Sequence, residues 1–189
     1  MEARAATTEA TKDRVLGAML QLFLELWYDE ITLKAVAEKA GVALQTVLNH
    51  FSSKDGLLAA LLEDRRLLDA FAGQRFHAQP GDDVAVPMQL LVSDYERAGD
   101  AMVRLLALEA RIPAVKPVLD MGRIGHRLWL ESVYGYELNG QRGDAREHRL
   151  DLLVCVTDVY TWHILRRDQG HSRAETLAAI LEMVRAIMA

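Results

Sequence analysis

The sequence predicts an all-α fold of about nine helices, and three observations support this prediction. Apolar residues recur at intervals of three and four along most of the 189-residue chain, which is the period of one helix face. No stretch alternates apolar and polar residues as a half-buried strand does. Only four prolines occur. The pattern predicts two domains, a three-helix domain over residues 1–53 and a larger helical domain over residues 54–189.

Three helices are expected in the first domain. Thr11 is the expected N-cap of the first, whose apolar face consists of Val15, Leu16, Met19, Leu22, Phe23 and Leu26. A second helix is expected between Thr32 and Gly41, because a threonine hydroxyl caps a helix start and glycine adopts the left-handed conformation that ends one. Residues 44–51 complete the domain as a third short helix.

A long fourth helix is expected to begin at Ser52 or Ser53 and to reach Phe71. The segment HAQPGDD, residues 77–83, is the clearest break in the chain. Proline, glycine and acidic capping residues occur together there.

Five further helices are expected after this break. They cover residues 84–97, 100–111, a segment from Pro113–Pro117 to Tyr136, 146–167 and 172–188. Proline is tolerated in the first turn of a helix and not later, which sets the start of the third of these. Ser172 and Glu175 form the S-x-x-E capping box of the last one. A polar loop, residues 138–144, separates the third from the fourth.

Composition excludes several classes of protein. With 27 acidic and 22 basic side chains the net charge is −5, so the chain does not coat nucleic acid by bulk charge, although a local DNA-reading patch stays open. The apolar runs are too short for a membrane span and no apolar leader is present. We therefore expect a soluble cytoplasmic protein without membrane contact. The single cysteine, Cys155, lies in an apolar run and is interpreted as a buried, inert thiol.

Residues 32–51, TLKAVAEKAGVALQTVLNHF, have the pattern of a helix-turn-helix, in which the second helix enters the major groove of DNA. The residues expected on its outer face are Ala43, Leu44, Gln45, Thr46, Asn49 and His50. Glutamine and asparagine pair with adenine edges, while leucine and alanine contact thymine methyl groups. Thr46 and the helix N-termini at Thr32 and Ser53 can hold phosphates.

The longer stretch from Thr11 to Leu62 resembles the DNA-binding region of the TetR family. The matching features are Leu22-Phe23, Tyr28, Thr32, the V-A-x-x-A-G-V core of Val36–Val42, Thr46, His50-Phe51 and Ser53–Leu58. The resemblance implies a homodimeric transcriptional regulator, expected to be a repressor. It would bind a palindromic double-stranded DNA operator and be released by a small-molecule effector bound within residues 54–189. Neither an enzymatic activity nor a cofactor is expected.

By this resemblance, Thr46, His50 and Lys54 contact phosphates. The positions that face base edges or the backbone are Ala43, Leu44, Gln45 and Asn49. The chain departs from the family pattern at Leu44, where lysine or arginine is common, and at Leu48, where tyrosine is common. Residues 1–53 also carry five basic and seven acidic side chains, a balance opposite in sign to a DNA footprint. These departures keep open a second hypothesis, a TetR-like module that binds a ligand or a protein and no longer reads DNA.

Methionine, aromatic and histidine side chains of the second domain are the candidate effector contacts. They are Met88, Tyr95, Met102, Met121, His126, Trp129, Tyr160 and His163. Methionine and aromatic residues line adaptable apolar cavities, so an apolar or aromatic effector is expected. The alternative for each of them is ordinary core packing.

The last two helices are expected to form the dimer interface, as the resemblance implies. The residues expected there are Leu153, Val156, Tyr160, Leu177, Ile180, Leu181 and Val184. No metal-binding or catalytic motif is found. Asp168-x-x-His171 is interpreted as a helix end.

Overall fold

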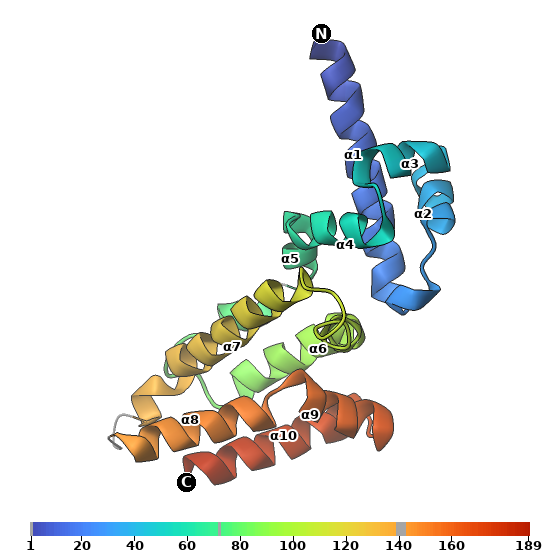
Figure 1. Cartoon of the computed structure of the whole chain (residues 1–189). Helices are drawn as coiled ribbons and strands as arrows, with labels where there is room; N and C mark the ends of the chain where they lie inside the picture. Colours follow the sequence, from blue (N-terminus) through green and yellow to red (C-terminus); the bar gives the residue numbers. More distant parts are fainter. Residues whose placement is uncertain (1, 72, 139–142) are drawn as a thin grey trace. The chain divides into compact units, whose positions relative to one another are not determined.

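The structure, a computed structural model, describes residues 2–71, 73–138 and 143–189, and within these ranges it contains helices and no strand. Its α-helices are α1 (Glu2–Glu25), α2 (Leu33–Ala40), α3 (Leu44–Phe51), α4 (Lys54–Leu62), α5 (Arg65–Phe71), α6 (Ala85–Leu106), α7 (Val115–Leu138), α8 (Asp144–Val156), α9 (Val159–His163) and α10 (Arg173–Met188) (Figure 1). Shorter helical segments are η1 (Tyr28–Glu30), η2 (Gln74–His77) and the π-helical η3 (Ile164–Asp168). The all-α prediction is confirmed.

The chain divides into two compact units. The N-terminal unit contains residues 1–70 together with the segment 107–116, and the C-terminal unit contains residues 71–106 and 117–189. Helix α4 packs against α1 and α3 within the N-terminal unit. The predicted boundary after residue 53 separates the DNA-binding helices from the effector-binding helices by function. It stays a prediction.

Local capping signals place the helices of the N-terminal unit. Thr32 Oγ1 accepts a hydrogen bond from the backbone N–H of Ala35 at 3.1 Å, and Gly41 ends α2 with φ of 65°. Ser53 Oγ accepts from the N–H of Gly56 at 3.0 Å and begins α4. These three predictions are confirmed, because each depends only on residues within one helical turn.

The predicted N-cap at Thr11 is wrong. Helix α1 begins at Glu2, and the Thr11 hydroxyl donates to the carbonyl of Thr7 at 2.9 Å inside the helix. The alanine-rich residues before the apolar stripe continue the helix backwards, since alanine has the highest helix propensity.

The predicted long fourth helix is broken into α4 and α5. The break lies at Asp64, whose Oδ1 accepts from the backbone N–H of Arg66 at 2.8 Å and starts a new helix. The Arg66 guanidinium also pairs with Asp64 and with Asp13 of α1, at 2.8 and 2.9 Å. A side chain that serves as a cap therefore ends one helix and begins the next.

Helix α6 is continuous where two helices were predicted. The predicted break lay between residues 97 and 100. Gly99, within it, and Asp100, the predicted start of the second helix, have packing roles instead. A Cβ at Gly99 would lie 2.5 Å from the ring of Trp162, so glycine lets α6 approach α9 closely. Asp100 pairs with Arg167 at 2.9 Å.

One helix was predicted over residues 146–167, but the structure has two there, because the chain breaks between α8 and α9. Asp158 accepts from the backbone N–H of Tyr160 at 2.8 Å and caps the short helix α9. The capping box of Ser172 and Glu175 at the start of α10 is confirmed. Of the predicted polar loop, residues 139–142 lie outside the described residues.

The core of the C-terminal unit is formed by α6, α7, α8, α9 and α10, with Met88, Leu91, Trp162, Ile180 and Val184 fully buried. Cys155 is exposed, so its interpretation as a buried thiol is wrong. The helix turns Leu153 inward and carries Cys155 to the opposite face. No described helix is both long enough and apolar enough to cross a bilayer.

Candidate functional site

Helix α3 presents the face that the helix-turn-helix pattern predicts. Val47 is fully buried and attaches the helix to the rest of the N-terminal unit. Ala43, Leu44, Gln45 and Asn49 are exposed, and Thr46 and His50 are half-buried. A short helix held by one buried face and open along the other has the geometry of a recognition helix.

The two amide side chains of α3 are linked. Gln45 Nε2 donates to Asn49 Oδ1 at 2.9 Å across one helical turn. This bond holds the two amides together and leaves the Gln45 carbonyl and the Asn49 amino group for further partners. An amide carbonyl and an amino group are the acceptor and donor that recognise an adenine edge.

Lys54, a predicted phosphate contact, is occupied within the N-terminal unit. Its Nζ donates to the carbonyls of Tyr28 and Ile31 at 2.9 and 3.0 Å, and lies 4.2 Å from the centre of the Tyr28 ring. The Tyr28 hydroxyl donates to Asp55. Burial and this carboxylate raise the pKa of Tyr28 above its usual range. Lys54 thus anchors η1 to α4, with at most one N–H left for a phosphate.

Other cations of this unit are also paired. Arg111, from the segment 107–116, makes a two-bond ion pair with Asp29 at 2.8 and 2.9 Å. The hydrogen bonds from Arg111 lower the pKa of the Asp29 carboxyl. Lys34 lies 3.8 Å from Glu38 on the surface of α2. Little positive charge is therefore available to DNA in this unit. The count of charged residues in the sequence had indicated an acidic excess, but it could not show which cations form ion pairs.

The structure brings part of the predicted effector set together. Met88, Tyr95 and Trp129 are buried in one cluster of the C-terminal unit, and Met102 packs against it half-buried. His126 stacks on Trp129 with ring centres 5.6 Å apart. Three others lie elsewhere: the exposed Met121 and Tyr160, and His163, whose Nδ1 is 3.8 Å from Asp168.

Polar groups that sequence reasoning missed complete this cluster. The Tyr95 hydroxyl donates to the carbonyl of Thr157 at 2.9 Å, and His126 Nε2 lies 2.9 Å from Thr157 Oγ1. Trp129 Nε1 donates to the carbonyl of Arg75 at 2.9 Å. Burial, together with the charge of Arg75, lowers the pKa of His126 to about 3. Thr157 is the C-cap of α8 and lies on the helical stripe of that segment, whereas Arg75 lies in η2, where no periodic pattern indicates it.

The residues predicted for a dimer interface divide into two groups. Leu153, Ile180 and Val184 are fully buried in the core of their own chain. Val156, Leu177 and Leu181 are half-buried against the same core, and Tyr160 is 48% exposed. Two further apolar side chains, Leu152 and Ile164, are exposed on α8 and η3.

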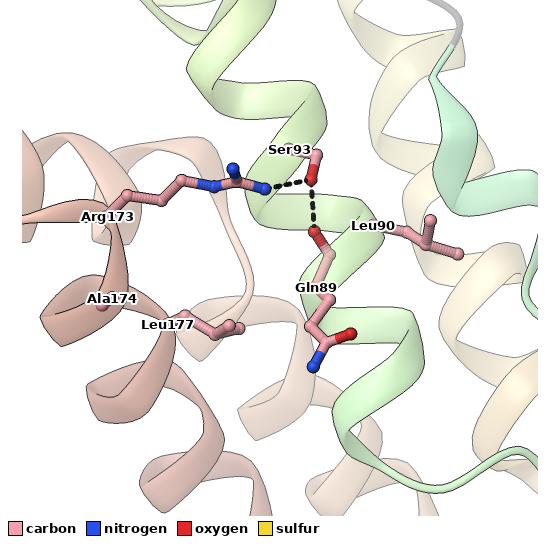
Figure 2. A pocket seen from close by; sticks show the side chains of 6 residues that line it. All are labelled: Gln89, Leu90, Ser93, Arg173, Ala174 and Leu177. Carbon is pink, nitrogen blue, oxygen red and sulfur yellow. Dashed lines mark hydrogen bonds between the residues drawn. The ribbon is translucent and has the colours of Figure 1, made fainter.

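A surface pocket of about 550 Å³ lies between α6 and α10 (Figure 2). It is lined by Gln89, Leu90, Ser93, Arg173, Ala174 and Leu177. Figure 2 shows that Arg173 donates to Ser93 Oγ, at 2.6 Å, and that Ser93 donates to the carbonyl of Gln89, at 2.7 Å. Gln89, Ser93 and Arg173 give the pocket polar groups, and Leu90, Ala174 and Leu177 give it apolar surface. In the described part of the chain, no three metal-binding side chains lie together.

Comparison with known proteins agrees with the helix-turn-helix geometry. Residues 15–61 match the family model described as bacterial regulatory proteins, tetR family. The chain is 28% identical over 180 residues to the HTH-type transcriptional repressor KstR of Rhodococcus jostii, covering 91% of this chain and 79% of that protein. It is 38% identical over 82 residues to the HTH-type transcriptional regulator AlkX of Mycobacterium tuberculosis, covering 39% of each.

Solved structures share the fold over nearly the whole chain. A transcriptional regulator from a Rhodococcus species superposes with a TM-score of 0.73 at 21% identity, covering 94% of this chain and 95% of that one. The multidrug binding protein EbrR, complexed with imidazole, has a TM-score of 0.60 at 20% identity and covers 90% and 88%. The family match includes α2, the turn and α3, and the relatives are regulators rather than enzymes. The chain belongs to the TetR family of bacterial transcriptional regulators and carries that family's helix-turn-helix DNA-binding domain.

Proposed function

We propose that this protein is a cytoplasmic repressor that binds a palindromic operator as a homodimer and leaves it when a small apolar or aromatic effector binds the C-terminal unit. The observation that carries the proposal is the outer face of α3, where Gln45 and Asn49 are exposed and joined while Val47 is buried. The relative KstR is described as a transcriptional repressor, which supports a repressor role for this protein. Two such helices in a symmetric dimer would read two half-sites.

Structural relatives support a small-molecule effector. One is described as a multidrug binding protein and was solved with imidazole. Another, with a TM-score of 0.54, is described as a flavonoid-responsive regulator. Both descriptions fit the aromatic cluster around Tyr95, His126 and Trp129. An effector releases the operator only if it binds the DNA-incompetent state more tightly.

Exposed apolar side chains support a dimer through α8, α9, η3 and α10. Leu152, Tyr160 and Ile164 are 38%, 48% and 48% exposed in the single chain. Large exposed apolar side chains favour burial against a partner.

We expect the double substitution Leu152→Glu and Ile164→Glu to shift the protein from dimer to monomer, because the new charges would be buried in the interface. Sedimentation velocity at several protein concentrations measures the change. Val86→Glu on α6, also 38% exposed in the wild type, is the matched control and should leave the dimer intact. A double variant with the dimerisation constant of the wild type would place the interface elsewhere.

Selection of bound sequences from a random DNA pool, at two salt concentrations, tests the proposal. An enriched palindrome supports it. A shallow dependence of affinity on salt is expected, since each phosphate contact adds to the slope and few cations are unpaired here. A folded, dimeric protein that enriches no sequence at low salt would refute operator binding.

One observation favours a second candidate, a regulator-like module that no longer reads DNA. Lys54 is occupied by backbone carbonyls and Arg111 by Asp29. Pairing of these cations within the chain weakens the non-specific attraction to DNA on which recognition is built. The same selection separates the two candidates.

A further inference from the structure

A group of buried polar side chains meets at Thr157, between α8 and α9. The Tyr95 hydroxyl donates to the Thr157 carbonyl and His126 lies against the Thr157 hydroxyl, both at 2.9 Å. Tyr95, His126 and Thr157 are 3%, 9% and 0% exposed. Carbonyls at the end of a helix have no partner within it, so the break after α8 makes the Thr157 carbonyl available.

The hydrogen bonds of Thr157 fix the protonation of His126. Thr157 Oγ1 donates its one proton to the carbonyl of Leu153 at 2.6 Å, so it can only accept from the histidine. His126 Nε2 therefore carries the hydrogen, and Nδ1 has a bare lone pair. The low pKa of His126 agrees with a neutral ring. Nδ1 is buried and has no hydrogen-bond partner among the described residues.

A second buried atom without a partner belongs to Arg75, a residue linked to His126 through Trp129. Arg75 Nε is one of four such side-chain atoms in the described residues, and His126 Nδ1 is another. Trp129 joins the two residues, because its ring stacks on His126 and its Nε1 donates to the Arg75 carbonyl. The charge of Arg75 also acts on His126 and on the Tyr95 hydroxyl. Buried polar atoms are nearly always hydrogen-bonded, so two buried polar atoms without a partner in one cluster point to a ligand.

The backbone holds Arg75 in place. The buried Asp94 of α6 accepts from the N–H groups of Gln74 and Arg75 at 2.8 and 3.1 Å. A Cβ at Gly73 would lie 1.7 Å from the Asp94 carboxylate, so glycine is required for this approach. The position of Arg75 is therefore set before any ligand arrives.

We propose that His126 Nδ1 and Arg75 Nε together bind the hydroxyl group of an otherwise apolar effector such as a phenol. The hydroxyl hydrogen is donated to Nδ1 and the hydroxyl oxygen accepts from the Arg75 N–H, so one group satisfies both atoms. The rings of Trp129 and Tyr95 supply apolar surface for the rest of the molecule. Arg75 is the least buried member of the cluster, so the ligand enters beside η2. This site rests on the proposed function, in which the C-terminal unit binds an effector.

Other ligand groups fit less well. A carboxylate has no proton to give to the lone pair of Nδ1, and an ammonium group is repelled by the charge of Arg75. An ether accepts from Arg75 and leaves Nδ1 without a partner, which keeps part of the cost of a buried unsatisfied acceptor. The site therefore distinguishes a hydroxyl from its methyl ether.

Phenol and anisole are the matched probes, titrated by calorimetry into the full-length protein without DNA. We expect phenol to bind about tenfold more tightly, the effect of one well-formed hydrogen bond. His126→Phe should bring the ratio close to one, because only phenol donates to Nδ1. Arg75→Met should weaken both probes by a similar factor and keep most of the ratio, because both probes accept from Arg75. His148→Phe, at an exposed position of α8, should change neither affinity. Circular dichroism checks that each variant is folded.

The ¹⁵N resonance of His126 Nδ1 in the wild-type protein gives a readout that needs no variant. Phenol should shift it toward the hydrogen-bonded range and anisole should not. Equal affinities of the two probes, or a resonance that neither probe moves, would overturn the site and leave a buried water as the partner of both atoms. Because no DNA is present, these results are independent of operator binding. Phenol binding as expected without any change in operator affinity would refute the proposed release and keep the site.

Discussion

Replacement of Trp162 by alanine is expected to lower the free energy of unfolding by about 3–5 kcal/mol, the cost of removing a large buried aromatic side chain. Trp162 is fully buried at the centre of the C-terminal unit. Its Nε1 donates to Glu96 at 2.9 Å, and the ring fills the space that Gly99 leaves free. The substitution opens a cavity and removes one partner of Glu96, whose carboxylate keeps the bonds from Arg166.

The chain offers a matched control for this measurement. Trp27 is 51% exposed, and its replacement by alanine should change stability by about 0.5 kcal/mol or less. Urea unfolding followed by circular dichroism compares the two variants. One protein concentration must be used throughout, since a dimer is stabilised by mass action. Equal losses for Trp162→Ala and Trp27→Ala would show that Trp162 does not hold the core together.

The protein is expected to lose about 2 kcal/mol of stability through His126 alone between pH 7 and pH 5. Burial lowers the pKa of this histidine from 6.5 to about 3 in the folded chain. A group with a depressed folded-state pKa contributes stability that is present above its unfolded-state pKa and is lost as the pH falls. Here the unfolded chain takes up the proton near pH 6.5, and the folded chain takes it up only near pH 3. Stability therefore falls by up to about 1.4 kcal/mol per pH unit within this window.

Other groups titrate in the same range, so a variant must isolate the contribution of His126. His126→Phe keeps a ring against Trp129 and removes the titration. Urea unfolding at pH 7 and pH 5 should give a fall about 2 kcal/mol smaller for the variant than for the wild type. Identical pH dependence in both proteins would mean that His126 is protonated in the folded state at pH 5.

Features controlled by a few neighbouring residues could be predicted from the sequence. The caps at Thr32, Ser53 and Ser172 and the left-handed Gly41 each depend on one turn of chain. The exposed face of α3 follows from the helical period once Val47 is assigned to the core.

Features that depend on contacts between distant segments could not be predicted. Glycine usually favours a helix end, yet Gly99 lies inside α6, where the ring of Trp162 packs against it. Arg75 belongs to the candidate effector site because its carbonyl accepts from Trp129, and Thr157 belongs to it because its hydroxyl contacts His126. No periodic pattern connects these residues.

A helical stripe also does not show which surface it packs against. Leu153, Ile180 and Val184 have the spacing of an interface, and the structure uses them within their own chain. Leu152 and Cys155, on the other face of α8, are exposed. Apolar residues that face the core and those that face a partner have the same period, so only the structure separates them.

The central claim is that α3 reads DNA through the linked amides of Gln45 and Asn49, and a repeated DNA selection with the double variant Gln45→Ala, Asn49→Ala tests it most directly. We expect the variant to lose preference at one position in each half-site and to bind the wild-type operator more weakly by about 10- to 100-fold for each half-site, the discrimination of one good amide–adenine pair. Gln21→Ala, at an exposed position of α1, should select the wild-type palindrome. If the double variant also selected that palindrome with unchanged affinity, α3 would not be the reading helix.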